Sequence, residues 1–188
     1  MASTNDSVLF GVKQIDMINL ESDGSADASA TEYSVDNPQE VSITAVYNDG
    51  ERHVLRGGDD IIAVIEEDEK LLGFDVNFTL AELVPEVDGV ICGGTATGAS
   101  DKWESPASAS EDAYPFSMEM WVQKYSESDS YSSTDGYIKF TFPFCKGRRD
   151  TQSHADKSFG SPSYVARCRR NPDSDAVAMT YEKVASIS

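Results

Sequence analysis

The sequence is poor in the residues from which metal sites, disulfide frameworks and many catalytic centres are built. It holds three cysteines, Cys92, Cys145 and Cys168, and two histidines, His53 and His154, all far apart in the chain. An odd number of cysteines without close spacing argues against a disulfide framework and against a zinc site. We therefore expect reduced, buried thiols, with neither a metal nor a cofactor.

Long apolar runs are also missing. The longest unbroken run covers residues 61–65, whereas a membrane helix needs about 20 apolar residues. The first six residues carry neither the basic nor the apolar segment that a secretory signal requires. We expect no secretory signal and no membrane insertion of this chain.

Motifs for catalysis or ligand binding are absent as well. The glycine-rich segment 93–98 lacks the Lys-Ser/Thr ending of a phosphate-binding loop. Residues 126–130 alternate serine with acidic residues but miss the spacing that closes a calcium site. No nucleophile is paired with a base, and any one carboxylate pair is uninformative among 33 acidic residues. We expect a protein that is not an enzyme.

Apolar and polar residues alternate with a period of two in several segments of the chain. In residues 71–80, large apolar residues occupy the even positions and small or polar residues fill most odd ones. This alternation predicts a strand with one face in the core and the other in water. Similar patterns predict strands at residues 8–18 (bulged at Gly11), 116–122, 137–144 (with Pro143 at an edge or bulge) and 163–170, and a short edge strand at 176–181.

The segment from residue 41 to residue 69 predicts a hairpin followed by a further strand. Residues 41–47 and 52–56 are β-prone and flank Asn48-Asp49-Gly50, and Asp-Gly favours a tight hairpin turn. The next strand, 61–69, is apolar on both faces in its first half, which predicts burial on both sides. Its second half is acidic, and we expect these carboxylates to be exposed to solvent or to line a water-filled space.

One short helix is predicted after the alternating strand. Thr79 to Glu82 fit a capping box, and Leu80, Leu83, Val84 and Val87 follow at helical spacing. Pro85 forbids a long helix. Together, seven or eight strands predict a mostly β fold: an antiparallel sandwich or barrel with one short flanking helix and long loops. We expect a single domain over residues 1–188, with loops or arms at about 21–34, 95–115, 126–136 and 146–162.

The charge is strongly one-sided. The formal net charge is −18, yet residues 146–170 contain seven of the 15 basic residues and only two acidic ones, a local net charge of +5. Three interpretations are open for this segment. It is a solvated basic edge, or a patch that meets an acidic patch on the next identical copy, or a nucleic-acid site. The last lacks the interleaved aromatic residues that such sites use.

Four features follow one another in a distinctive order: the hairpin leading to Leu55-Arg56-Gly57-Gly58-Asp59-Asp60, the alternating strand, the short helix that closes at Val90 to Gly94, and the last strand before Asn171-Pro172. This order resembles the tail tube (major tail) proteins of siphophage-type bacteriophages. The similarity covers roughly residues 8–94 and 137–172. The resemblance implies a β-sandwich whose copies form stacked, hexameric rings around a genome channel.

The resemblance also implies surfaces, partners and a location. An acidic wall repels phosphates and lets DNA pass transiently and without sequence preference. The expected lumen-facing residues are Glu66, Glu67, Asp68, Glu69, Asp75 and Asn77. The expected subunit-interface residues are Lys146, Arg148, Arg149, Arg167, Arg169 and Arg170. The implied partners are further copies of the chain and tape-measure and tail-terminator proteins, in the virion tail and, during assembly, in the host cytoplasm.

Two other functions remain open. One is a β-sandwich module that binds carbohydrates or a receptor, although such modules usually expose several aromatic residues on one sheet face. The other is a tail-completion or head–tail connector protein, which has the same physical properties but another position in the particle.

Overall fold

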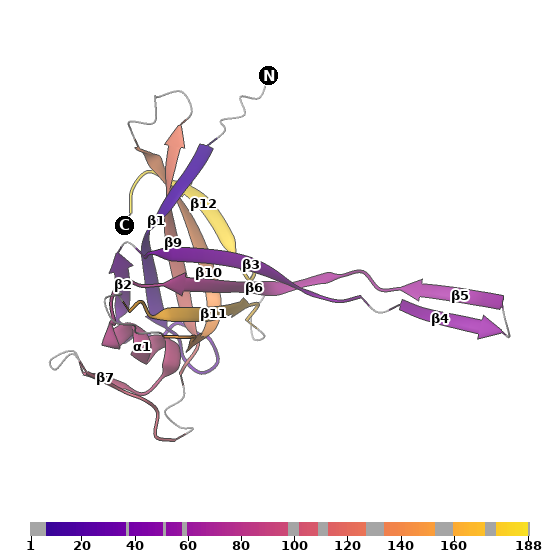
Figure 1. Cartoon of the computed structure of the whole chain (residues 1–188), viewed down its shortest axis with the longest axis horizontal. Helices are drawn as coiled ribbons and strands as arrows, with labels where there is room; N and C mark the ends of the chain where they lie inside the picture. Colours follow the sequence, from indigo (N-terminus) through magenta and orange to yellow (C-terminus); the bar gives the residue numbers. More distant parts are fainter. Residues whose placement is uncertain are drawn as a thin grey trace.

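The protein is a curled antiparallel sheet from which a long arm projects (Figure 1). The computed structural model describes residues 7–36, 38–50, 52–57, 60–97, 102–108, 113–126, 134–152, 160–171 and 176–187. The elements in chain order are β1 (Ser7–Asn19), β2 (Glu32–Asp36), β3 (Glu40–Asn48), β4 (Arg52–Gly57), β5 (Asp60–Glu66), β6 (Lys70–Thr79), α1 (Pro85–Cys92), β7 (Thr95–Thr97), β8 (Lys102–Glu104), β9 (Phe116–Ser126), β10 (Thr134–Arg149), β11 (Ser163–Arg169) and β12 (Thr180–Val184). The expected fold class, mostly antiparallel β with a short helix, is confirmed.

The main sheet runs in the order β2-β1-β9-β10-β11-β6-β3, with β12 also paired to β10. The first part of β10 pairs with β12 and its last part with β11. Between them, the ladder to β9 shifts register between Phe142 and Cys145, around Pro143, which has no amide hydrogen to donate. Figure 1 shows β11, β6 and β3 crossing in front of β1, β9 and β10. One sheet thus supplies both layers of the fold.

The core lies between these two layers, and α1 packs against β10 and β1 beside it. Its members include Ile15, Met17, Val76, Phe78, Leu80, Val87, Val90, Ile91, Phe116, Met118, Met120, Phe142 and Tyr164. The ring of Phe78 stacks on that of Tyr164 with 5.4 Å between the centroids. The alternation predicted for residues 71–80 is confirmed from Phe74 to Leu80 but wrong at Leu72, which is 48% exposed. The alternation predicted for β11 is also confirmed, because its apolar positions are buried or half-buried. The predicted bulge at Gly11 is also confirmed, since the β1–β9 ladder shifts register there.

The helix begins later than the capping box predicted. Residues 80–84 are not helical, and α1 starts at Pro85, which occupies the first helical turn. Proline suits that position, because the amide hydrogen it lacks would have no partner within the helix and its φ angle is already helical. The buried positions Val87, Val90 and Ile91 therefore form the apolar stripe of a later helix than the one the capping box indicated.

The predicted hairpin between residues 41–47 and 52–56 is wrong. β3 pairs with β6, and β4 pairs with β5, so that the chain turns between Gly57 and Asp60 rather than at Asn48-Asp49-Gly50. A Cβ atom on Gly50 would collide with the carbonyl oxygen of Glu67. Glycine is needed there because the segment that connects β5 to β6 passes so close, and not because the chain reverses.

β3 and β6 leave the body as a two-stranded ribbon, and beyond Asn48 and Lys70 the chain leads into the separate two-stranded sheet of β4 and β5 (Figure 1). We call residues 47–57 and 60–71 the arm. From Tyr47 to Gly57 it is about 33 Å long, at about 3.3 Å per residue.

The predicted loops are shorter than expected. Residues 32–34 belong to β2, residues 134–136 and 146–149 to β10, and the segment 95–115 contains the small hairpin of β7 and β8. Trp103 in β8 donates a hydrogen bond from its indole nitrogen to the carbonyl oxygen of Gly93 (2.9 Å), which ties this hairpin to the end of α1. Within the described part of the chain, no helix has the length and apolarity needed to cross a membrane.

Candidate assembly surfaces

The arm exposes large apolar side chains on both of its faces. Val54 lies opposite Val64 on one face, whereas Leu55 shares the other face with Ile65. The exposed fractions are 59% for Leu55, 65% for Ile62 and 64% for Ile65. More than half of the exposed large apolar residues in the described chain lie between residues 47 and 72.

This exposure overturns the predicted burial on both sides for residues 62–65, all of which are exposed. An isolated two-stranded ribbon is marginally stable in water, and nothing in the described part of the chain covers these side chains. Removing Leu55, Ile62 and Ile65 from water would contribute about 1–2 kcal/mol each, given that roughly 60% of each is accessible. The arm is therefore suited to burial against another molecule.

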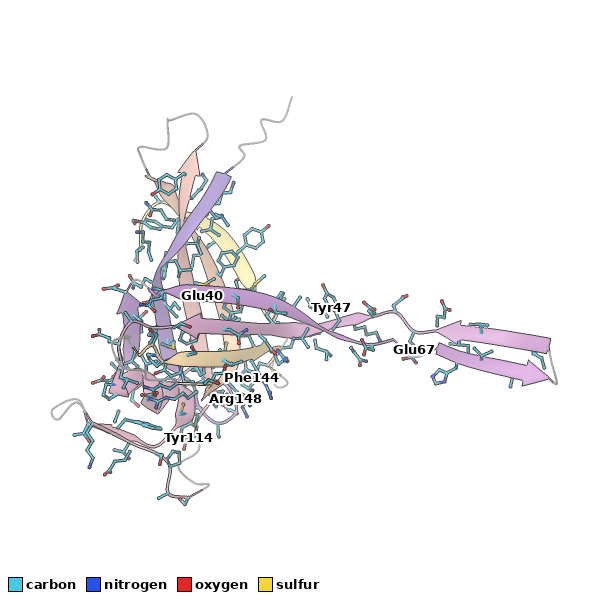
Figure 2. All side chains as sticks on the ribbon, in the orientation of Figure 1. Glu40, Tyr47, Glu67, Tyr114, Phe144 and Arg148 are labelled. Atoms are coloured by element: carbon cyan, nitrogen blue, oxygen red, sulfur yellow. The ribbon has the colours of Figure 1, made fainter. Side chains whose placement is uncertain are left out.

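The arm also carries a concentrated negative charge. Glu67, Asp68 and Glu69 connect β5 to β6 and are all exposed, and we call them the acidic bend. Glu66, the last residue of β5, is exposed as well. Figure 2 shows Glu67 partway along the arm, well away from the body.

A basic surface lies on the body, on the side of β10 and β11 that faces away from the core. Lys146 and Arg148 alternate with inward-facing residues of β10, and Arg167 is the register partner of Lys146. All three are exposed, and we call them the basic face. Among the described residues, no carboxylate lies within ion-pair distance of any of them.

The structure brings together two groups of residues that were expected to have different roles. Asp75 is the register partner of Arg167, and Asn77 follows it on the same outward face. Asp75 accepts a hydrogen bond from the guanidinium of Arg169 (2.8 Å), so its charge is already paired. This face is thus basic where a lumen-facing acidic wall was expected, and the acidic bend lies elsewhere, in the arm. Arg170 is exposed just beyond the end of β11.

Arg149 was expected at a subunit interface, but it is engaged within its own chain. Its guanidinium binds both carboxylate oxygens of the buried Asp88 in α1. It also lies 5.0 Å from the ring centroid of Trp103. The hydroxyl of Tyr164 donates to the same carboxylate (3.0 Å). This cluster, which sequence reasoning missed, holds α1 and the β7–β8 hairpin against β10 and β11.

Tyr164 makes the stability of this cluster sensitive to alkaline pH. Burial, reinforced by the negative charge of Asp88, raises the pKa of Tyr164 above its ordinary value of 10.0. The unfolded chain therefore loses this proton at a lower pH than the folded one. The contribution of Tyr164 to stability is complete below pH 10 and declines above it by up to about 1.4 kcal/mol per pH unit.

We expect the stability advantage of the wild type over Tyr164→Phe to be constant between pH 8 and pH 9 and to shrink as the pH rises from 10 to 11. Urea unfolding at each pH measures it. An advantage that grows above pH 10 would contradict the raised pKa. The titration of the other tyrosines cancels in this difference, because both proteins contain them.

The aromatic residues give little support to a carbohydrate-binding face. Trp121 is only 2% exposed, and its indole nitrogen donates to the carboxylate of Asp16 (2.6 Å). Trp103 is half-buried against Arg149. The exposed Tyr114 and Tyr181 do not lie on the same strand, because Tyr114 precedes β9 and Tyr181 belongs to β12.

The arm thus exposes apolar side chains that the described chain does not cover, and the basic face exposes cations that pair with no carboxylate of the described chain. One offers apolar area and negative charge, and the other offers positive charge. No protein-family model and no curated protein sequence matches this chain.

Proposed function

We propose that this protein is a non-enzymatic structural subunit that assembles with copies of itself, as a tail tube protein does. In this function, stacked, six-membered rings form a channel through which a phage genome passes. The protein would assemble in the host cytoplasm and be located in the virion tail. Tape-measure and tail-terminator proteins would be its partners. The single observation that carries the proposal is the arm.

Three properties of the arm favour assembly over other functions. It is long, both of its faces are apolar, and the described body leaves these faces uncovered. Large exposed apolar areas on soluble proteins mark interaction sites. The resemblance of the element order to tail tube proteins then favours further copies of the chain as the partner.

The lumen assignment changes in this proposal. Asp75 and Asn77 share a face with the basic residues, so that face suits contact between subunits better than passage of DNA. The net charge of −18 still favours an acidic channel wall, to which other exposed acidic residues contribute. A connector protein at the end of a tail is the second candidate, because the arm would serve it equally well.

The test is self-association of the purified full chain. We expect light scattering after size-exclusion chromatography to show a mass that rises with concentration from the 20.5 kDa of the monomer. We expect negative-stain microscopy to show rings or tubes. Closed rings that never stack would favour the connector, whereas a monomer at all concentrations, with glycan binding on an array, would support the binding module instead.

A further inference from the structure

We infer that the arm of one copy docks on the basic face of another copy, with the acidic bend against Lys146, Arg148 and Arg167. This inference depends on the proposed self-assembly and names the surfaces that make it. It brings the exposed apolar side chains and carboxylates of the arm together with the exposed cations of the basic face.

The charges on the two surfaces are complementary in number and sign. The acidic bend offers the three carboxylates of Glu67, Asp68 and Glu69, all exposed. The basic face offers three exposed cations, and Asp75, the acidic residue on the same face, is already bound to Arg169. Complementary charges determine register and suppress wrong partners in an interface.

The dimensions agree as well. Lys146 and Arg148 are two positions apart on one strand, which separates them by about 6.6 Å. Arg167 lies directly across from Lys146, at about 5 Å between Cβ atoms. Glu67 and Glu69 are also two positions apart, and in an extended segment they span about the same 6.6 Å.

The contact must join two different copies. Figure 2 shows Glu67 out along the arm and Arg148 on the body, and the two are clearly separated. Glu69 directly precedes Lys70, which with Asn48 forms the last register pair of the β3–β6 ladder, so this ladder holds the acidic bend away from the body. An arm that binds a different surface on the next copy makes a head-to-tail contact, which generates rings or open stacks.

The apolar faces and the charges have separate roles in this contact. Burial of side chains such as Leu55 and Ile65 supplies affinity, because they are largely exposed in the single chain. The charged residues determine where the arm lands. DNA is a weaker candidate for the basic face, because the aromatic residue that alternates with these cations on β10, Phe144, is half-buried and offers no exposed ring for base stacking.

Charge reversal tests the pairing. The arm variant carries Glu67→Lys, Asp68→Lys and Glu69→Lys, and the face variant carries Lys146→Glu, Arg148→Glu and Arg167→Glu. A third protein combines all six changes. Every substituted residue is exposed, so each variant should fold, and circular dichroism with thermal unfolding checks this.

We expect the arm variant and the face variant each to raise the concentration needed for self-association by about tenfold or more, because like charges then face each other. We expect the combined protein to return close to the wild-type value, since its charges are again opposite. An equimolar mixture of the arm and face variants should co-assemble for the same reason. The matched control is Glu21→Lys, Glu32→Lys and Asp36→Lys, three exposed residues in or near β2 at the opposite sheet edge from β3.

The outcomes separate the inference from the function on which it depends. A wild-type chain that never associates overturns both. Wild-type assembly that none of the reversals weakens overturns only the docking inference. The docking inference alone also fails if both single sets weaken assembly but the combined protein does not recover, or if the β2 control weakens assembly as strongly as the arm variant does.

Discussion

Joining Asn48 directly to Lys70 through an Asn-Gly turn, and so removing residues 49–69, should give a folded monomer that no longer self-associates. Asn48 and Lys70 are register partners at the end of the β3–β6 ladder, where a two-residue turn closes an antiparallel pair. None of the described side chains between residues 49 and 69 is buried. The free energy of unfolding should therefore change by no more than about 1 kcal/mol, whereas the mass in solution should stay that of the monomer at every concentration.

A matched variant separates the length of the arm from its apolar surface. Leu55→Ser, Ile62→Ser and Ile65→Ser keep the arm at full length but remove much of its exposed apolar area. We expect this protein to associate more weakly than the wild type. If the shortened chain assembles as readily as the full one, then the arm is not the element that joins subunits, whatever role it has.

Replacing Asp88 by alanine should lower the stability of the monomer more than any other single change at the cluster of α1, β10 and β11. The substitution leaves the guanidinium of Arg149 and the hydroxyl of Tyr164 without the carboxylate they share. Asp88 is 2% exposed, and breaking a buried ion pair by removing one partner costs about 3 kcal/mol or more. For a chain of this length, the midpoint of thermal unfolding should fall by roughly 6–12 °C.

Calorimetry or thermal unfolding followed by circular dichroism measures this loss. Tyr164→Phe is the control, because it removes one hydrogen bond from the same carboxylate and should cost only about 1 kcal/mol. The two variants should differ clearly in midpoint. Equal and small losses for both would mean that Arg149 finds another partner, and that the carboxylate of Asp88 does not hold α1 to the sheet.

The sequence indicated some residues of the candidate assembly surfaces, but not the cluster around Asp88. The concentration of basic residues between 146 and 170 was visible, because it needs only counting. Asp88 carried a weaker signal that was missed: it lies at i+4 from Val84 and i−3 from Ile91, and so it is a carboxylate on an apolar helical stripe. The pairing of Arg149 with Asp88 was not accessible, since 61 positions separate them in the chain.

The sequence by itself determined most of the long strands of the main sheet and, in β6 and β11, which face enters the core. The reason is local: successive side chains on a strand point to opposite faces, so alternation in residues 74–80 and in β11 specifies both the structure and the buried side. The bulge at Gly11 and the break around Pro143 were predictable for the same kind of reason, from the backbone chemistry of single residues.

Only the tertiary structure decided which strand pairs with which, and from this the candidate function follows. Asp49-Gly50 has the chemistry of a turn, but β3 gains a longer ladder by pairing with β6, so the turn moves to residues 57–60 and the arm forms. Pairing also places Arg167 opposite both Lys146 and Asp75. Such pairings depend on hydrogen bonds between residues distant in the chain, which no local pattern encodes.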